Sequence, residues 1–169
     1  MHVLVLNIKD ITAENIYFMD AKKNILMDGI FSKMIFIHPY FSINGIYIDL
    51  PITIQKTENI SRDYASKQTI SFLVAHHSYL LHQIELLEKN ILDKYIPFDT
   101  SLPKIYSIMQ TMKLGYFRVF REASTSSSSS SSSSSKMEVS KKSEFILKIS
   151  GIWENAKGYG LSYKIVEIC

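Results

Sequence analysis

One short segment of the sequence combines aromatic and cationic side chains in a pattern suited to binding nucleic acid. It runs Gly115-Tyr116-Phe117-Arg118-Val119-Phe120-Arg121. Because side chains alternate between the two faces of a strand, Tyr116, Arg118 and Phe120 would share one face. Aromatic rings stack on unpaired bases, and a guanidinium pairs with phosphates. The segment therefore predicts a site for single-stranded nucleic acid. The alternative is that one face packs in the core and Arg118 caps it, because Tyr and Phe favour strands in general.

Basic side chains on other predicted strands would extend this site. Lys148 and Lys164 fall at polar positions of the two C-terminal strands, and Lys33 falls at such a position in the N-terminal half. Trp153 lies at the end of a neighbouring strand. The alternative is that these lysines are solvated surface, and only their convergence on one face would favour binding. The predicted nucleic-acid-binding residues are Tyr116, Arg118, Phe120, Arg121, Lys33, Lys148, Lys164 and Trp153.

No catalytic motif accompanies these residues. The sequence contains neither a Gly-x-Ser-x-Gly elbow nor a glycine-rich phosphate loop, and its carboxylates are scattered. His76, His77 and His82 cluster, but without the spacing of four residues that places two ligands on one helix face. We expect His77 to pack with its nitrogens hydrogen-bonded and the other two to face solvent. The sequence therefore predicts no enzyme, no metal site and no cofactor.

The composition indicates one domain with a real hydrophobic core. The chain has 169 residues, of which 46% are hydrophobic, and we expect a single domain over residues 1–169. The net charge of +3 permits binding to a polyanion without requiring it. No stretch approaches the ~20 apolar residues of a membrane span, so no membrane partner is expected. A single cysteine, Cys169, excludes an intramolecular disulfide and favours a reducing compartment.

The N-terminal third predicts a meander of strands. Asn44-Gly45 stands between Phe41–Ile43 and Ile46–Ile48. This dipeptide is typical of a type I′ hairpin turn, because both central residues of that turn have positive φ. Pro39 cannot donate to a strand ladder, so we expect a break, a bulge or a sheet edge there.

The hydrophobic period changes between Ile70 and Tyr95. Apolar positions then recur at alternating spacings of four and three residues, which predicts a long amphipathic helix. The residues of this stripe are Leu73, His77, Leu80, Ile84, Leu87 and Ile91. The stripe is either core or an interface with a partner. A second, shorter helix is predicted from Pro103 to Gly115.

Strands are predicted again in the C-terminal part. They span Tyr116–Arg121, Phe145–Trp153 and Tyr159–Ile168, and the last two form a hairpin. Ser126–Ser135 lies between the first two of these strands. This run of serines buries nothing that could offset the entropy lost on ordering it. We expect a disordered Ser-rich loop over residues 123–143 within the domain.

Several phrases of the sequence resemble an uncharacterised protein family of nucleocytoplasmic large (giant) DNA viruses. They are Lys22-Lys23-Asn24-Ile25-Leu26-Met27-Asp28-Gly29, Phe41-Ser42-Ile43-Asn44-Gly45-Ile46-Tyr47, Ile149-Ser150-Gly151-Ile152-Trp153-Glu154 and Tyr159-Gly160-Leu161-Ser162-Tyr163-Lys164. The resemblance covers most of the chain. It implies a viral protein of the host cytoplasm or nucleus, in a viral factory, with the virion as an alternative.

The predicted element order resembles the oligonucleotide-binding (OB) barrel of viral and phage single-stranded DNA-binding proteins. In that fold the helix lies between the third and fourth strands. The resemblance implies an α+β, β-rich fold, in the form of an OB-like antiparallel barrel or bent sheet with one long amphipathic helix. It also implies binding of single-stranded DNA or RNA in replication or recombination, with the serine tract in a binding loop.

A structural or assembly protein, such as a minor virion component or a homo-oligomer, is the alternative function. It would use the long helix as its interaction surface. An exposed ridge of Leu80, Ile84 and Leu87 would favour assembly, whereas a basic face lined by Tyr116 and Arg118 would favour nucleic acid.

Overall fold

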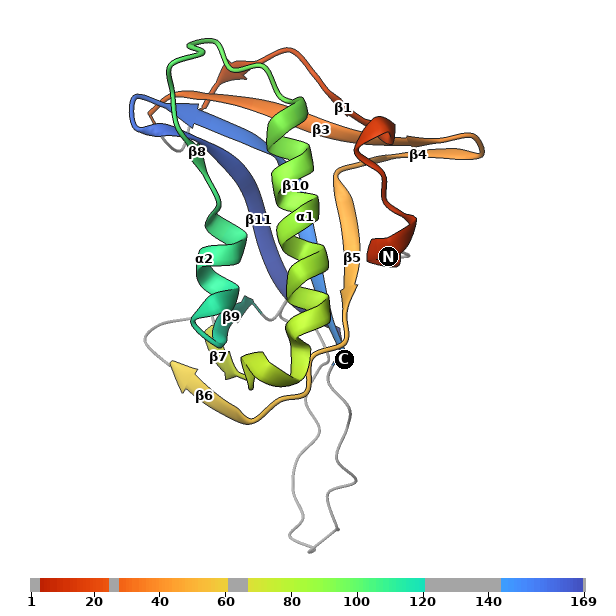
Figure 1. Cartoon of the computed structure of the whole chain (residues 1–169), viewed down its shortest axis with the longest axis vertical. Coiled ribbons are helices and arrows are strands. Elements are labelled where there is room, and N and C mark those ends of the chain that lie inside the picture. Colours follow the sequence, from red (N-terminus) through yellow and green to blue (C-terminus); the bar gives the residue numbers. More distant parts are fainter. Residues whose placement is uncertain (1–3, 25–27, 61–66, 121–143, 169) are drawn as a thin grey trace, which may run out of the picture.

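The chain folds as a mixed α+β, strand-rich structure with an open sheet and one long helix (Figure 1). The computed structural model describes residues 4–24, 28–60, 67–120 and 144–168. The predicted Ser-rich loop at 123–143 and Arg121 lie outside the described residues.

The described elements alternate irregularly between strands and helices. The helices are α1 (Ser78–Lys94) and α2 (Ser107–Lys113), with 3-10 turns at Ile8–Asp10, Ala13–Asn15 and Val74–His77. The strands are β1 (Ile16–Phe18), β2 (Lys22–Lys23), β3 (Ile30–His38), β4 (Phe41–Asn44), β5 (Ile46–Leu50), β6 (Lys56–Ile60), β7 (Lys67–Ser71), β8 (Lys104–Ile105), β9 (Tyr116–Phe120), β10 (Glu144–Asn155) and β11 (Gly158–Ile168).

The described strands form one sheet whose main path runs β1-β3-β10-β11-β9-β7-β6. Off this path, β2 and β4 pair with β3, β5 pairs with β10, and β8 pairs with β11. The path ends at β1 and β6 without closing, so the sheet is open and not a barrel. β11 pairs in parallel with β8 and β9, whereas the sequence predicts antiparallel pairing throughout. The placement of the long helix after a third strand is also wrong, because α1 follows β7. The OB topology is therefore not confirmed.

The Asn44-Gly45 step is a corner of the sheet and not the predicted hairpin turn. β4 pairs with β3, whereas β5 leaves it and pairs with β10. Gly45 has a φ of +76°, and a Cβ there would lie 2.5 Å from the carbonyl oxygen of Ile149. The hairpin turn lies upstream instead, where His38 faces Phe41 across Pro39 and Tyr40. The predicted break at Pro39 is confirmed, but the positive φ of Gly45 carries the chain between two neighbouring strands.

β10 changes its neighbour at a bulge. Its first half, Phe145–Ile149, pairs with β5, and residues from Gly151 to Glu154 pair with β3. The register against β11 shifts between Ile149 and Gly151. A Cβ on Gly151 would lie 2.2 Å from the carbonyl oxygen of Ser32, so the approach of β3 requires glycine here. The predicted C-terminal hairpin is confirmed as β10 and β11.

Both helices cover the same face of the sheet (Figure 1). Ile84, Leu87 and Ile91 of the predicted stripe are buried, and so the stripe is core. The helix begins later than predicted, because Ile70 belongs to β7, and Leu73 is exposed. His77 is half-buried, and its Nε2 accepts a hydrogen bond from the Thr53 amide at 3.1 Å, as expected of a structural histidine. No helix in the described ranges is long and apolar enough to cross a bilayer.

Ile84→Asp should unfold the domain. Loss of a buried isoleucine side chain costs about 2–5 kcal/mol, and the new carboxylate would be buried without a partner. Leu86→Asp on the same helix is the matched control, because Leu86 is 41% exposed and Ile84 is 1% exposed. Urea denaturation followed by circular dichroism measures both. Equal stability of the two variants would show that the stripe is not core.

Candidate nucleic-acid interface

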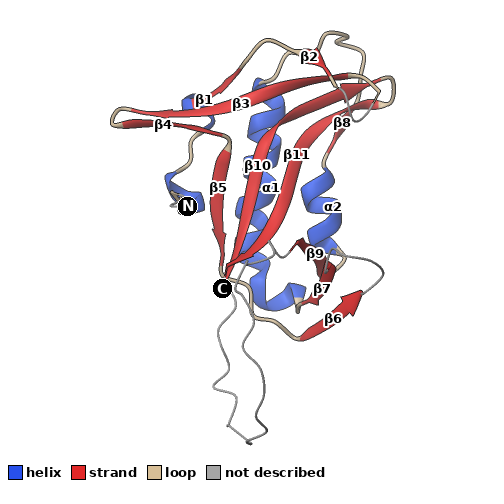
Figure 2. Ribbon diagram, turned by 180° about the vertical axis from the view of Figure 1, so that it is seen from behind, coloured by secondary structure: helices blue, strands red, loops and turns tan. Residues whose placement is uncertain are grey.

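The sheet has an outer face, defined here as the face turned away from α1 and α2. In Figure 2 β5, β10 and β11 lie in front of the two helices and nothing described covers them. Ile48, Leu147 and Ile165 are cross-strand partners and are all buried on the helix side. Because side chains alternate along a strand, their preceding or following neighbours point to the outer face.

A row of cations crosses the outer face. Lys148 is the direct partner of Tyr47 on one side and of Lys164 on the other. The Lys148 Nζ lies 5.0 Å from the centre of the Tyr47 ring, a cation–π contact. Arg118 continues the row on β9, since Lys164 and Arg118 each precede a member of the parallel pair Ile165–Val119. Three cationic residues thus occupy neighbouring backbone positions on β10, β11 and β9, with a tyrosine at the end on β5.

β9 shows the predicted alternation. Phe117 is 1% exposed and Val119 is fully buried, whereas Tyr116 is 41% exposed and Arg118 is also exposed. Phe117 and Val119 thus form the core-facing side of β9, as the alternative requires, whereas Tyr116 and Arg118 lie on its exposed side. Phe120 belongs to β9 by its backbone, but its side chain, like Arg121, lies outside what the structure describes.

A second part of the outer face lies beyond the bulge. Lys33 is exposed and pairs with Gly151, and Trp153 pairs with Phe31. Trp153 also faces Gly160 on β11, where a Cβ would lie 2.9 Å from the indole. The glycine therefore lets the half-buried indole lie close against β11. The structure brings six predicted residues to this one face: Lys33, Tyr116, Arg118, Lys148, Trp153 and Lys164.

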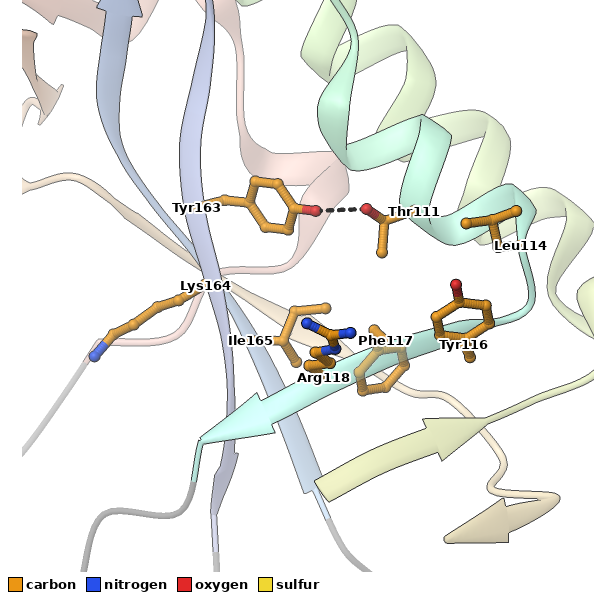
Figure 3. A pocket seen from close by; sticks show the side chains of 8 residues that line it. All are labelled: Thr111, Leu114, Tyr116, Phe117, Arg118, Tyr163, Lys164 and Ile165. Atoms are coloured by element: carbon orange, nitrogen blue, oxygen red, sulfur yellow. Dashed lines mark hydrogen bonds between the residues drawn. The ribbon is translucent and has the colours of Figure 1, made fainter. Parts of the chain in front are cut away.

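A pocket of about 320 Å³ opens between β9 and β11 (Figure 3). The two strands pair only at Ile165–Val119 and Val166–Phe120, so they are not bonded on the side of Tyr116 and Tyr163. The end of α2 closes this gap, and the Tyr163 hydroxyl lies 2.8 Å from the Thr111 hydroxyl there. Burial raises the pKa of Tyr163 above its ordinary value, so its hydroxyl stays protonated. The lining residues are Thr111, Leu114, Tyr116, Phe117, Arg118, Tyr163, Lys164 and Ile165.

No protein-family model, curated protein or solved structure matches the chain. The geometry of the outer face is therefore the basis for assigning a function.

A buried carboxylate that the sequence pattern did not single out holds α2 in place. Glu88 is fully buried, and its two carboxylate oxygens accept hydrogen bonds from the Ile108 amide at 3.0 Å and the Met109 amide at 2.9 Å. These are unpaired amides of the first turn of α2, whose N-cap residue, Tyr106, makes no side-chain cap. Burial raises the Glu88 pKa, and the two hydrogen bonds oppose that rise. The sequence signal for its burial is its spacing, because Glu88 lies one helical turn after the buried Ile84 and so on the same face of α1.

A second buried carboxylate, Glu154, holds the segment that follows α1 in place. Its side chain is buried and accepts hydrogen bonds from the Phe98 amide at 3.0 Å and the Asp99 amide at 3.3 Å. The Tyr95 hydroxyl donates to it at 3.4 Å. Both buried glutamates thus bind backbone amides and are not part of the outer face. Among the described residues, no three His, Cys, Asp or Glu side chains gather as metal ligands.

The Glu88 carboxyl should make stability fall with rising pH. Because its pKa in the folded state lies above the ordinary 4.5, the folded state binds more protons than the unfolded chain between the two values. The free energy of unfolding therefore falls as pH rises from 4.5 through the folded-state pKa. Glu88→Gln removes this titration. Urea denaturation of both proteins from acid to neutral pH gives the difference, and a rise in wild-type stability relative to the variant would contradict the raised pKa.

Proposed function

We propose that the outer face binds single-stranded DNA or RNA. The observation that carries the proposal is the convergence of Tyr47, Lys148, Lys164 and Arg118 in one row across four strands. A nucleic-acid strand laid across β5, β10, β11 and β9 would meet a cation on three successive strands. Scattered surface lysines have no reason to fall into register in this way.

The aromatic residues favour an unpaired strand over a duplex. Tyr116, Trp153 and Tyr47 are at least partly exposed on the same face as the cations. Aromatic rings can stack only on bases that are not already stacked and paired within a duplex. Both described α-helices lie on the other side of the sheet, so neither offers a recognition helix for a major groove from this face.

The proposal extends to replication or recombination of a large DNA virus, in the host cytoplasm or nucleus. That extension rests on the sequence resemblance alone. It does not require a closed OB barrel, because an open sheet with one uncovered face presents the same combination of cations and rings.

Assembly is the second candidate, and the observation that favours it lies away from the long helix. Ile84 and Leu87 are buried, so the predicted ridge is not available to a partner. Ile96 and Phe98, in contrast, are 83% and 92% exposed on the segment that Glu154 fixes. Two large apolar side chains held on an ordered loop fit a contact with another protein surface.

Lys164→Ala should weaken binding to a labelled single-stranded oligonucleotide and make its salt dependence shallower. Removing one cation that pairs with a phosphate reduces the slope of log K against log salt by roughly 0.7 on a single strand. Lys89→Ala is the matched control, because it removes the same charge from an exposed position on α1. If the two substitutions had equal effects, binding would depend only on the net charge of the protein and not on the outer face. A folded wild-type protein that binds no single strand at low salt would overturn the proposal.

Tyr116→Ala should weaken the same binding by about 1–3 kcal/mol and leave the salt slope unchanged, because stacking releases no counterions. Arg118→Ala, at the next position of β9 on the same face, should change both affinity and slope. Intrinsic fluorescence of Trp153, the only tryptophan, follows the titrations without a label. A change of slope in the Tyr116 variant would contradict a stacking role.

Phe98→Ser separates the two candidate functions. If the outer face is the functional surface, this substitution should leave oligonucleotide affinity unchanged, whereas the charge reversal Lys148→Glu with Lys164→Glu abolishes binding. Sedimentation velocity on the same proteins reports self-association. A wild-type oligomer that Phe98→Ser dissociates, together with no oligonucleotide binding by wild type, would establish assembly instead.

A further inference from the structure

The pocket between β9 and β11 joins the outer face to α2. Tyr116 and Arg118 contribute from the outer-face side of β9, whereas Phe117 belongs to the buried side of the same strand. Thr111 and Leu114 contribute from α2 and its C-terminal end. The pocket therefore lies where the sheet is interrupted, and a group on the outer face can enter it between the two strands.

The lining has the chemistry of a slot for one flat, polar-edged ring. Leu114, Phe117 and Ile165 supply apolar surface. Thr111 and Tyr163 offer two hydroxyl oxygens. Their protons are engaged with the Ser107 carbonyl and with each other, so these oxygens can accept hydrogen bonds from a ligand. The volume of about 320 Å³ falls at the small end of the range for ligand sites, about 300–1,000 Å³.

The charge at the pocket matches a single phosphate. The Arg118 guanidinium lines the pocket, while the Lys164 side chain extends away from it in Figure 3. One inward-facing cation suits one phosphate group, and the apolar lining is not suited to a free inorganic anion. A nucleobase that carries its own phosphate satisfies both parts of the lining at once.

We propose that this pocket takes one nucleobase of the bound strand, with the adjoining phosphate on Arg118. The inference rests on the proposed function and deepens it. The base leaves the outer face between β9 and β11, lies against Phe117 and Ile165, and meets the Thr111 and Tyr163 hydroxyls with its polar edge. Because both hydroxyl protons are engaged within the protein, the pocket suits a base edge that carries a hydrogen-bond donor, such as an exocyclic amino group.

NMR spectra of the methyl groups, recorded on the isotope-labelled full chain, test the inference. The probes are the methyl groups of Thr111, Leu114 and Ile165 in the pocket, with Leu50 and Leu92 in the distant core as controls. Titration with deoxyadenosine monophosphate at millimolar concentration should shift the pocket methyls through the ring current of the base and leave the controls unchanged. Deoxyribose 5-phosphate, which lacks the base, should bind at least about fivefold more weakly.

Two substitutions test the assigned contacts. Arg118→Ala should weaken mononucleotide binding about tenfold or more, because the variant has no charge-assisted hydrogen bond to the phosphate. Leu114→Trp should fill the pocket and abolish the methyl shifts, and it should fold because Leu114 is 63% exposed. Leu86→Trp, at an exposed leucine of α1, is its matched control and should bind normally.

The outcomes distinguish the pocket from the outer face as a whole. If an oligonucleotide binds and depends on Lys148 and Lys164, but neither it nor the mononucleotide shifts the pocket methyls, the pocket inference is overturned and the proposed function stands. Equal binding of deoxyribose 5-phosphate also overturns it, since the site would then recognise only an anion. If the mononucleotide shifts the methyls and no oligonucleotide binds, the proposed function fails and the pocket is a site for free nucleotides.

Discussion

The arrangement of the whole sheet depends on one strand, β10, having two different neighbours along one edge. β5 occupies the first half of that edge and β3 the second, and the change occurs at the bulge between Ile149 and Gly151. Three chain segments meet there so closely that Gly45 and Gly151 have no space for a Cβ. At this corner the chain turns so that β5 runs beside the first half of β10, whereas β3 crosses its second half (Figure 1). Without this change of neighbour, Tyr47 would not lie beside Lys148, and the row of three cations would lack the tyrosine at its end on β5.

Charges in this protein fall into two groups that do different physical work. Glu88 and Glu154 are buried, and each forms hydrogen bonds with two backbone amides of a segment that follows α1. A buried carboxylate is tolerated only when its oxygens are satisfied, so these two residues fix α2 and the loop before it. Lys148, Lys164 and Arg118 lie on the outer face, and no described ion pair involves them. The first group orders the helices behind the sheet and the second is left available to a polyanion. The pocket lies at the boundary of the two, since the helix that closes it is held by Glu88.

Local patterns allow some of this structure to be predicted, and long-range pairing limits the rest. The alternation on β9, the β10–β11 hairpin and the buried positions Ile84, Leu87 and Ile91 all follow from periodicity within one element. The hairpin predicted at Asn44-Gly45 is wrong because a positive φ serves a corner as well as a hairpin, and only the distant partner strand β10 decides between them. The parallel pairing of β9 with β11 has no signature in either strand. Glu88 escapes prediction because a glutamate in an amphipathic helix normally faces solvent, and the amides it binds belong to another helix.

An open sheet with helices on one side must expose the other side, and what covers that side is a question of chemistry rather than of fold. An antiparallel sheet left bare to water usually carries mixed polar residues of both charges. Here the central row has cations on three adjoining strands, with Tyr47 at one end, and beyond Arg118 it continues through Thr69 to Glu58, which pairs with Lys56. Neighbouring like charges destabilise a sheet by a few tenths of a kcal/mol to about 1 kcal/mol per pair. Lys148 and Lys164 are such a pair, and the fold alone gains nothing from placing them opposite each other. A bound anionic strand would relieve that repulsion, and this is the physical reason for proposing that the row binds a ligand.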